Sequence, residues 1–517
     1  MLEKLRNIIV IFILVYIIVG CSKQPTLIST QIEIIFPTAS PGNNSPQSSP
    51  TIKATPTLSF SLMPSPIPGS NAVSPTPDQP HAMPTNEPNP DTYTVQYGDY
   101  LSKIANTFLV SVDSLIQLNE IQDPNNLSIG TILKIPPQSL QEPGPDFKLI
   151  PDSELVFGPM SIWFDLTGII AYYKGFLFNY SETVNDNVMS GAEIISLVSR
   201  NYSVNPRLLL AILEYQSGWL TNSEPDESTI NFPFGYENIY YSGLYKQSAW
   251  AADTLNRGYY LWKVNGLSDL VTVDGEVIPL SPVINAGTAS IQNYFSALDN
   301  YENWKMDVSS QGFYQEFVNL FGNPFNLSIE PLVPVDLKQP EMILPFETGK
   351  VWAFTGGPHG GWDSGSAWAA LDFAPPGDAQ GCIESADWVT AVADGLIVRT
   401  ENGAVLQDMD GDGFEQSGWV VLYMHIAENE RVAFGTYVLA GERIGHPSCE
   451  GGVSNGTHVH LARKFNGEWI SADGNVPFNL EGWISSGTGT IYDGYLTRGS
   501  DVVEAYNGNN AINEIQR

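Results

Sequence analysis

The feature that most limits what this chain can fold into is the stretch 22–90, which is made largely of Pro, Ser, Thr and Asn. With few large apolar side chains, such a segment cannot bury enough surface to offset the conformational entropy lost on ordering. Its prolines favour extended polyproline conformations, so we expect a semi-stiff linker. A glycosylated, mucin-like stalk would have the same composition. The remainder of the 517 residues has room for about three folded domains.

The first 21 residues have the pattern of an export signal. Basic residues precede an apolar run from Ile8 to Val19, which is too short to cross a bilayer. The run leads into Gly20-Cys21 and there resembles the lipobox of bacterial lipoproteins, in which the chain is cut before the cysteine and the cysteine is acylated. The resemblance predicts a lipid on Cys21 and an extracytoplasmic, membrane-anchored lipoprotein at the cell envelope. An uncleaved anchor or an ordinary secretory leader would also export the rest of the chain.

The charge balance argues against one class of partner. The chain has 56 acidic and 23 basic residues, which gives a net charge of −33. Nucleic acids and anionic lipid surfaces repel so acidic a protein, so we expect it to bind no nucleic acid. With Cys21 assigned to the lipid, Cys382 and Cys449 form an even pair in an oxidising compartment.

A first folded unit is expected at residues 91–137. Alternation, helical spacing of apolar side chains and turn residues are typical of strand, helix, helix and strand at 93–97, 101–108, 112–119 and 133–136. Asp99 is the expected N-cap of the first helix. This βααβ order, with Tyr-Thr-Val-Gln-Tyr-Gly-Asp-Tyr-Leu-Ser at its front, resembles a LysM module.

LysM modules bind glycans that contain N-acetylglucosamine, such as peptidoglycan and chitin. The resemblance therefore implies peptidoglycan as a partner and places the glycan-binding groove at Gly98, Asp99, Tyr100, Leu101, Asn125 and Asn126. A small stable spacer that binds nothing is the alternative.

Residues 150–335 are rich in aromatic side chains and are expected to be mostly helical. In the clearest helix, Asn205 can act as N-cap and Pro206 is preorganised for the first helical position. The stretch resembles the start of the lysozyme-like catalytic core of lytic transglycosylases, where a helix ends in Glu-Ser-Gly and the glutamate is the general acid/base. Gln216 stands in that place, and a carboxamide cannot transfer the proton. Glu214 would point elsewhere on the helix, so we expect a non-catalytic domain.

Near the end of the chain, His458 and His460 are two residues apart in Gly-Thr-His-Val-His-Leu-Ala-Arg. In an extended strand, side chains two apart project from the same face, and two imidazoles held in this way suit a metal ion. A polar strand face that carries two histidines by chance is the alternative. The chain has only six histidines, however, and one chemistry accounts for four of the last five.

Residues 340–490 have short strands separated by glycines, a pattern that predicts a mostly antiparallel β domain. Six sequence segments of this region, in their order along the chain, resemble the lysostaphin/LytM-type zinc endopeptidases of peptidoglycan. They are the His-x-His strand and Trp352–His359, Ala370–Gly377, Val389–Val398, Trp419–His425 and Gly435–Gly445. Residues 491–517 are expected to be a C-terminal tail.

The resemblance implies a ligand set and two catalytic histidines. His359, Asp372 and His460 would bind zinc and leave a fourth tetrahedral position open. His425 and His458 would steer the attacking water and stabilise the developing oxyanion. His446 has no counterpart in the family.

One departure from the family concerns the aspartate. The usual spacing His-x-x-x-Asp is that of His359 and Asp363, whereas Asp372 has the family's following residues, Phe-Ala-Pro-Pro-Gly. A nine-residue insertion before Asp372 accounts for both facts. We assign the ligand to Asp372, because the ligand must lead directly into the strand that positions it, but Asp363 stays open as the alternative.

A second candidate metal site is the turn that contains Asp408, Asp410 and Asp412. Carboxylates at positions one, three and five with glycine at six imitate a Ca²⁺ loop. Trp419 stands at position twelve, where an EF-hand has a bidentate Glu, so an EF-hand is excluded. An acidic turn without metal is the alternative.

Together these patterns predict a multidomain chain with a small βααβ LysM module, a mostly α-helical lysozyme-like middle domain and a mostly antiparallel β metallopeptidase domain. The expected function is a cell-wall hydrolase, in which a zinc-dependent endopeptidase cleaves peptide bonds in peptidoglycan. The alternative is a non-enzymatic peptidoglycan-binding adaptor or amidase activator, whose relatives have lost metal ligands. A disulfide between Cys382 and Cys449 is expected, because both flank strands that would meet at the zinc; two separate thiols are the alternative.

Overall fold

The computed structural model describes residues 92–96, 99–108, 110, 112–121, 127–128, 130–135, 143–377 and 381–517. The predicted leader with Cys21 and the predicted linker 22–90 lie outside the described residues. Within the described ranges, none of the helices combines the length and the apolar character needed to cross a membrane.

The first unit has the βααβ order expected from the sequence. Strands β1 (Thr92–Thr94) and β2 (Ile132–Lys134) pair antiparallel, and helices α2 (Leu101–Thr107) and α3 (Val112–Leu118) lie between them in the chain. Asp99 does not act as the expected cap of α2, because its carboxylate accepts hydrogen bonds from Gln96 N at 2.7 Å and from Tyr93 Oη at 2.8 Å. It closes the turn that precedes the helix instead.

The middle region is helical, and α7 (Pro206–Ser217) lies at its centre. Asn205 accepts a hydrogen bond from Arg207 N and Gly218 ends the helix with a φ of 67°, so the local signals for both ends agree with the structure. The other helices are α4 (Leu166–Tyr173), α5 (Phe176–Asn179), α6 (Gly191–Tyr202), α8 (Leu244–Lys263), α9 (Ala286–Ser296), α10 (Tyr301–Asp307) and α11 (Phe313–Phe321).

Short elements complete the middle region. Two hairpins are formed by β3 (Ser181–Val184) with β4 (Asn187–Ser190) and by β5 (Asp269–Val271) with β6 (Val277–Pro279). The 3₁₀ turns are η1 (Asp152–Glu154), η2 (Pro159–Ser161), η3 (Glu227–Thr229), η4 (Ile239–Tyr241) and η5 (Pro324–Leu327).

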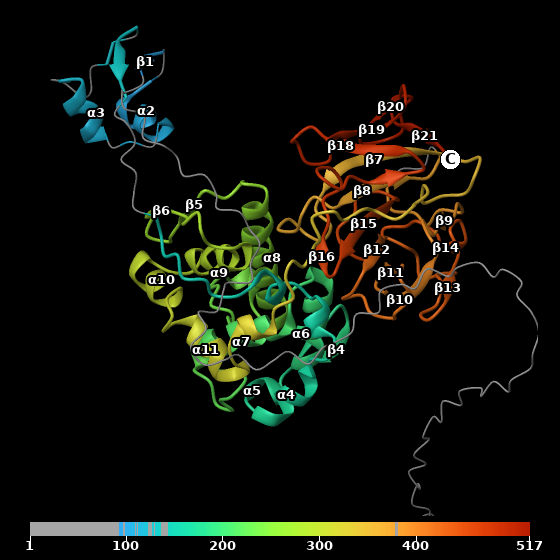
Figure 1. Ribbon diagram of the computed structural model, residues 1–517, viewed down its shortest axis with the longest axis horizontal. Helices are drawn as coiled ribbons and strands as arrows, with labels where there is room; N and C mark the ends of the chain where they lie inside the picture. The colour runs from blue at the N-terminus through green and yellow to red at the C-terminus, as the bar shows by residue number, and fades with distance from the viewer. Residues whose placement is uncertain are drawn as a thin grey trace, which may run out of the picture. The chain divides into compact units, whose positions relative to one another are not determined.

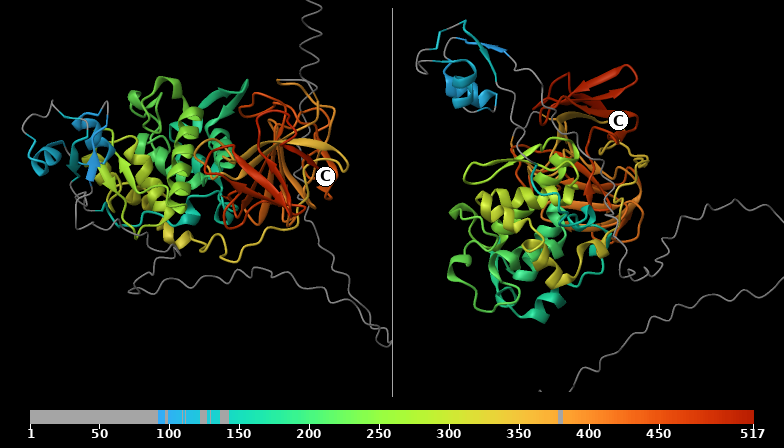
Figure 2. Two further views of the ribbon diagram at one scale, coloured as in Figure 1. Left: turned by 90° about the horizontal axis from the view of Figure 1, so that it is seen from above. Right: turned by 60° about the vertical axis from the view of Figure 1, so that its left-hand side comes forward.

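The C-terminal region is a β domain, seen in orange to red in Figures 1 and 2. Its main antiparallel sheet has the order β13-β10-β11-β12-β15-β8-β7-β21, and β16 pairs with β15. These strands are β7 (Val351–His359), β8 (Ala370–Ala374), β10 (Gly395–Glu401), β11 (Ala404–Asp408), β12 (Trp419–Met424), β13 (Tyr437–Val438), β15 (Val459–Phe465), β16 (Glu468–Trp469) and β21 (Glu514–Gln516). A two-stranded sheet adds β9 (Val389–Thr390) and β14 (Arg443–Gly445).

Residues 491–517 are not the tail expected from the sequence. Strands β17 (Asn479–Leu480), β18 (Trp483–Gly487), β19 (Gly494–Arg498) and β20 (Asp501–Glu504) form one sheet that crosses the expected boundary at 490. Strand β21 then pairs with β7 and buries Ile515. A short strand that covers the edge of another strand has no distinctive local pattern, so its role depends on the tertiary fold.

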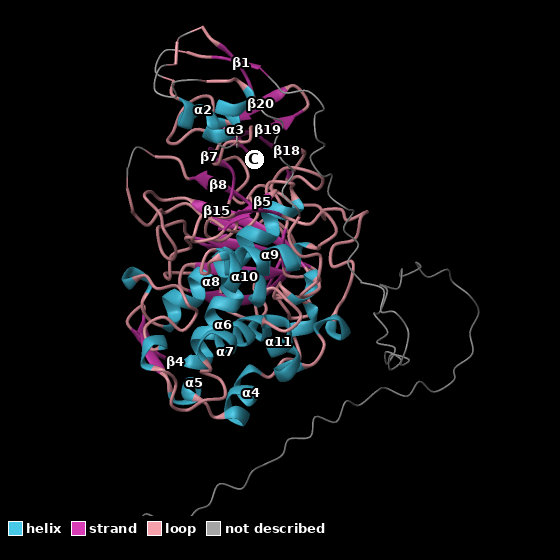
Figure 3. Ribbon diagram, turned by 90° about the vertical axis from the view of Figure 1, so that its left-hand side faces the viewer, coloured by secondary structure: helices cyan, strands magenta, loops and turns pink. Residues whose placement is uncertain are grey.

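The hydrophobic core of the helical region extends into the β domain, which also has a core of its own. The cluster that surrounds α7 and α8 continues into Leu406, Val420, Leu422 and Trp469 of the β domain. Apart from the two hairpins, helices and strands are segregated between the two regions, as the colouring in Figure 3 shows. Burial of apolar surface across the boundary therefore joins the two regions.

Candidate metal centre

The register of the central strands brings the predicted ligands together. In the antiparallel pair β15–β8, His460 lies directly opposite Asp372, and on the other side of β15 it lies opposite Met424. His425 follows Met424 at the end of β12, and His359 ends β7, the neighbour of β8. His359 and His460, which are 101 positions apart in the chain, thus meet where the four adjacent strands β12, β15, β8 and β7 bring their histidines and Asp372 together.

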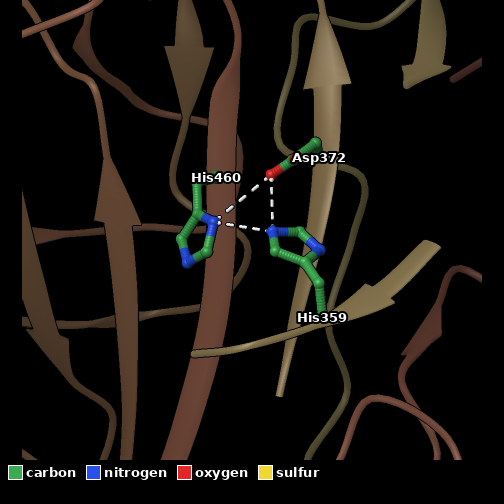
Figure 4. A group of neighbouring side chains, drawn as sticks. All are labelled: His359, Asp372 and His460. Atoms are coloured by element: carbon green, nitrogen blue, oxygen red, sulfur yellow. Dashed lines mark hydrogen bonds and ion pairs between the residues drawn. The ribbon is translucent and has the colours of Figure 1, made fainter. Parts of the chain in front are cut away.

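Three of the predicted residues converge on one point, as Figure 4 shows. Nε2 of His359 lies 3.0 Å from Nδ1 of His460. Oδ1 of Asp372 lies 3.2 Å from the first nitrogen and 3.3 Å from the second. All three side chains are largely buried, with exposed fractions of 4% for His359, 10% for Asp372 and 13% for His460.

The outer nitrogens of the two imidazoles determine what the inner nitrogens can do. Nδ1 of His359 donates to Gly357 O at 2.8 Å, and Nε2 of His460 donates to Gly361 O at 3.2 Å. A neutral imidazole that donates through one nitrogen presents a lone pair on the other. Two lone pairs and a carboxylate oxygen therefore face one another, and among the described residues no donor is aligned with the buried Oδ1 of Asp372. Such a donor set fits a metal cation, and Zn²⁺ above all.

The local electrostatics agree with this donor set at Asp372 and His460, whereas at His359 burial lowers the pKa but the facing Asp372 outweighs burial and raises it. Burial raises the pKa of Asp372, but the facing His359 and His458 outweigh this effect and hold that pKa well below its usual range. Burial also lowers the pKa of His460. The carboxylate and this imidazole are therefore both in the forms that bind metals at neutral pH.

Glycine is required where β7 approaches the ligand Asp372. A Cβ at Gly356 would lie 2.6 Å from Oδ2 of Asp372, closer than side-chain carbons pack. Gly356 thus lets β7 pass beside the carboxylate, a requirement that only a neighbouring strand could impose.

His425 and His458 line the same centre, and in both of them Nδ1 faces a backbone carbonyl. Nδ1 of His425 donates to Glu450 O at 3.1 Å and Nδ1 of His458 donates to Gly456 O at 2.8 Å, so each Nε2 carries a lone pair. Their ring centroids are 4.6 Å apart. Burial, together with His458 and His460, lowers the pKa of His425 to about 4. His425 is therefore neutral at pH 7 and able to accept a proton.

Sequence reasoning missed Tyr492. Its ring stacks on His359 with centroids 4.3 Å apart, and its backbone exchanges hydrogen bonds with Gly357 and Pro358. The backbone has a φ of 67°, a left-handed conformation that is uncommon for a non-glycine residue. Tyr492 was assigned to the tail, and no local signal in that segment indicates contact with a histidine 133 positions earlier.

The alternative ligand Asp363 lies elsewhere. It occupies an exposed turn with a φ of 56°, and its carboxylate accepts a hydrogen bond from Tyr202 Oη at 3.0 Å. His446 also lies outside the centre, where its ring packs against Trp388 and contacts Asp387 O and Glu430.

The acidic turn brings Asp408, Asp410 and Asp412 together. One oxygen of each carboxylate lies within 4.8 Å of the others. The buried carboxylate of Asp408 accepts hydrogen bonds from the backbone N–H groups of Asp410, Gly411 and Gly413. Burial and the neighbouring Asp408 raise the pKa of Asp410 to about 7. Backbone donors thus already neutralise part of the turn, and Ca²⁺ binding there stays a prediction.

The predicted glycan-binding residues are only partly described. Gly98, Asn125 and Asn126 lie outside the described residues. Tyr100 is 60% exposed, whereas Leu101 is buried in the small core of the LysM unit. Of this set, Tyr100 is therefore the side chain most available to stack on a sugar ring.

The structure links Cys382 and Cys449 by a disulfide with Cα atoms 5.4 Å apart. Next to it, Ile383 N donates to Thr457 Oγ1 and Thr457 N donates to Gly381 O, so this segment is tied to the chain that leads into His458. The bridge closes a loop between residues separated by 67 positions.

We expect the double variant Cys382→Ser/Cys449→Ser to be less stable than the wild type by up to about 4 kcal/mol, the loop-closure value for this length. Denaturant unfolding of both proteins measures the difference. Equal stability in the two proteins, or free thiols in a non-reducing peptide map of the exported protein, would contradict the bridge.

In the middle region, Gln216 and Glu214 have separate surroundings. Glu214 accepts hydrogen bonds from Leu220 N at 2.9 Å and Thr221 N at 3.1 Å, so it ties down the loop after α7. Gln216 lies next to Gly235 and Tyr294. Glu214, two residues before Gln216 in the chain, thus has a structural role.

Two family models and one curated relative match parts of this chain. The LysM domain model matches residues 93–136, and the model "LasA, N-terminal domain" matches residues 148–334. The Protease LasA of Pseudomonas aeruginosa is 27% identical over 310 residues, which cover 55% of this chain and 68% of the relative.

Two solved structures are similar to part of the chain. The M23 metalloprotease pseudoalterin from the deep sea is 25% identical, covers 35% of this chain and 99% of its own, and has a TM-score of 0.29. The catalytic domain of lysostaphin from Staphylococcus simulans is also 25% identical, covers 23% of this chain and 87% of its own, and has a TM-score of 0.17.

The matches to the family models and to Protease LasA confirm the resemblance to LytM-type metalloendopeptidases that carry a LysM module. They support a peptidase. They do not support the similarity of the middle region to lytic transglycosylases, since the model that matches there is the LasA N-terminal domain.

Proposed function

We propose that this protein is a zinc-dependent endopeptidase that cleaves peptide bonds in peptidoglycan and is held on the cell wall by its LysM module. The observation that carries the proposal is the convergence of His359 Nε2, His460 Nδ1 and Asp372 Oδ1 within 3.3 Å of one another. The LysM match supports a peptidoglycan substrate, and the similarity to Protease LasA supports a peptidase.

The chain's own residues account for binding and proton transfer. His359, Asp372 and His460 would hold Zn²⁺, which when bound acts as a Lewis acid on the scissile carbonyl and on water. Because Nδ1 of His425 donates to Glu450 O, its Nε2 lone pair would accept a proton from the attacking water. His458, whose Nε2 lies 3.7 Å from Asp372 Oδ1, lies on the same side and would stabilise developing negative charge once Nε2 is protonated.

We further propose that the lipid on Cys21 and the linker 22–90 place the enzyme outside the cytoplasm, at the cell envelope. The lipobox pattern and the proline-rich composition support this location. Mass spectrometry of the mature N-terminus tests it, and an unmodified Cys21 in the mature chain would contradict it.

A chelator experiment on isolated sacculi tests the enzymatic proposal. We expect the purified protein to release new amino termini from peptidoglycan, to lose this activity when zinc is chelated and to recover it when zinc is restored. Binding to sacculi should survive chelation, because the LysM module needs no metal. Binding without any cleavage in the presence of zinc would instead support an adaptor.

The same chelated sample tests the middle region. With Gln216 in the place of the acid/base and Glu214 engaged in its loop, we expect no release of reducing sugars or anhydro-muropeptides. Detection of either product under chelation would show that the helical region is catalytic.

A further inference from the structure

The loop 360–369, which the insertion lengthens, connects the metal ligand His359 to strand β8. Gly361 of this loop supplies the carbonyl that accepts the Nε2–H of the ligand His460 at 3.2 Å. That hydrogen bond turns the lone pair of Nδ1 toward the metal centre. The position of the loop therefore determines how His460 presents its ligand atom.

The middle of the loop is held by the helical region. Tyr202, the last residue of α6, donates from Oη to Asp363 Oδ2 at 3.0 Å. Asp253 of α8 accepts from Gly365 N at 2.6 Å and from Ser364 Oγ at 2.9 Å. A Cβ at Gly365 would lie 2.0 Å from Asp253 O, so the turn is seated directly on the helix.

Internal contacts connect this anchored turn to Gly361. Trp362 N donates to Ser366 Oγ at 3.0 Å, and Gly361 N donates to Ala367 O at 3.0 Å. Gly361 also packs on the indole of Trp469, where a Cβ would lie 2.7 Å from the ring. The backbone N–H of Trp469 in turn donates to Tyr260 Oη of α8 at 2.9 Å. The helical region thus holds the loop in two ways: directly at residues 363–365, and through Trp469 at Gly361.

We propose that the helical region is a positioning element of the metal centre, in which Tyr202 and Asp253 hold loop 360–369 so that Gly361 O orients His460. This inference rests on the proposed function. It assigns a part in zinc binding to the helical region, which contributes no side chain to the metal centre itself. Tyr202 and Asp253 act only through the loop, so they are positioning residues.

Zinc affinity tests this role. We expect Tyr202→Phe and Asp253→Ala each to weaken zinc binding about tenfold, the lower end of the losses seen when a partner of a metal-ligating histidine is removed. Competition with a chromophoric chelator measures the affinity. Asp253→Asn, which keeps an oxygen for Gly365 N, should recover part of the loss. Excess zinc should restore kcat in Tyr202→Phe, whereas it would not repair a general folding defect.

Asn201→Ala is the matched control. Asn201 neighbours Tyr202 on α6 and accepts a 2.6 Å hydrogen bond from Arg399 of β10, so it crosses the same boundary without touching the loop. We expect this variant to lose stability and to keep the zinc affinity of the wild type. Wild-type affinity in both Tyr202→Phe and Asp253→Ala, or an equal loss in Asn201→Ala, would overturn the proposal.

Hydrogen exchange separates this proposal from the proposed function. In zinc-free protein, Tyr202→Phe and Asp253→Ala should speed exchange in peptides that cover residues 360–369 and leave peptides from β12 and β15 unchanged. If the wild type bound no zinc but the loop still exchanged faster in the variants, the endopeptidase would be refuted and the anchoring of the loop retained. Unchanged exchange in the loop would refute the anchoring.

Discussion

Replacing Asp372 by Ala is expected to remove zinc from the protein and to abolish cleavage of peptidoglycan. The carboxylate is largely buried and supplies the one oxygen that faces both imidazole nitrogens, so no other described group can replace it. Loss of a direct ligand should weaken zinc binding by more than the hundredfold or so that loss of a ligand's partner costs. We expect His460→Ala to behave in the same way.

Asp363→Ala is the comparison that decides between the two aspartates. Asp363 faces Tyr202 and not the metal centre, so the variant should still bind one zinc per chain when zinc is in excess. Because it removes the acceptor of Tyr202, we expect only the weakening predicted for Tyr202→Phe. Metal analysis of dialysed protein measures both variants. Zinc retained in Asp372→Ala and lost in Asp363→Ala would show that Asp363 is the ligand.

The second large effect is expected for His425→Ala, which should keep zinc and lose turnover. His425 lies beside the centre but is not among the three converging side chains, and its proposed role is to accept a proton. Loss of a general base lowers the rate by about 10² to 10⁴, so kcat should fall by that factor while the zinc content stays at one per chain.

His446→Gln is the control for this prediction. His446 is equally buried, but it packs against Trp388 outside the centre, so kcat should stay close to the wild-type value. If His425→Ala lost its zinc together with its activity, His425 would be a ligand or would support one. An unchanged kcat in His425→Ala would remove it from the mechanism.

Several parts of the fold follow from short-range signals. Asn205 and Pro206 begin α7 and Gly218 ends it, because capping and left-handed termination depend on neighbouring residues. The order of strands and helices around 92–134 also follows from alternation and helical spacing. Local signals misled where a side chain had a competing partner: Asp99 binds Gln96 and Tyr93 instead of capping α2.

Contacts between residues that lie far apart in the chain could not be predicted from short-range signals. Strand β21 was expected to be part of a tail, since a short strand that pairs with β7 has no periodicity of its own. Tyr492 stacks on His359 because β18 and β19 carry its loop across β7. Asp253 and Tyr202 contact loop 360–369 because the hydrophobic core of the helical region extends into the β domain.

The sequence by itself determined that His458 and His460 share one face of a strand, since side chains alternate along extended backbone whatever surrounds it. It also predicted a strand that follows Asp372; in the structure β8 begins at Ala370, so Asp372 lies within the strand. Only the tertiary structure decided that Asp372 lies opposite His460, because the register between two strands is set by packing and by hydrogen bonds across the sheet. The same long-range packing seats the loop 360–369 on α8, and with it the carbonyl that orients the metal ligand.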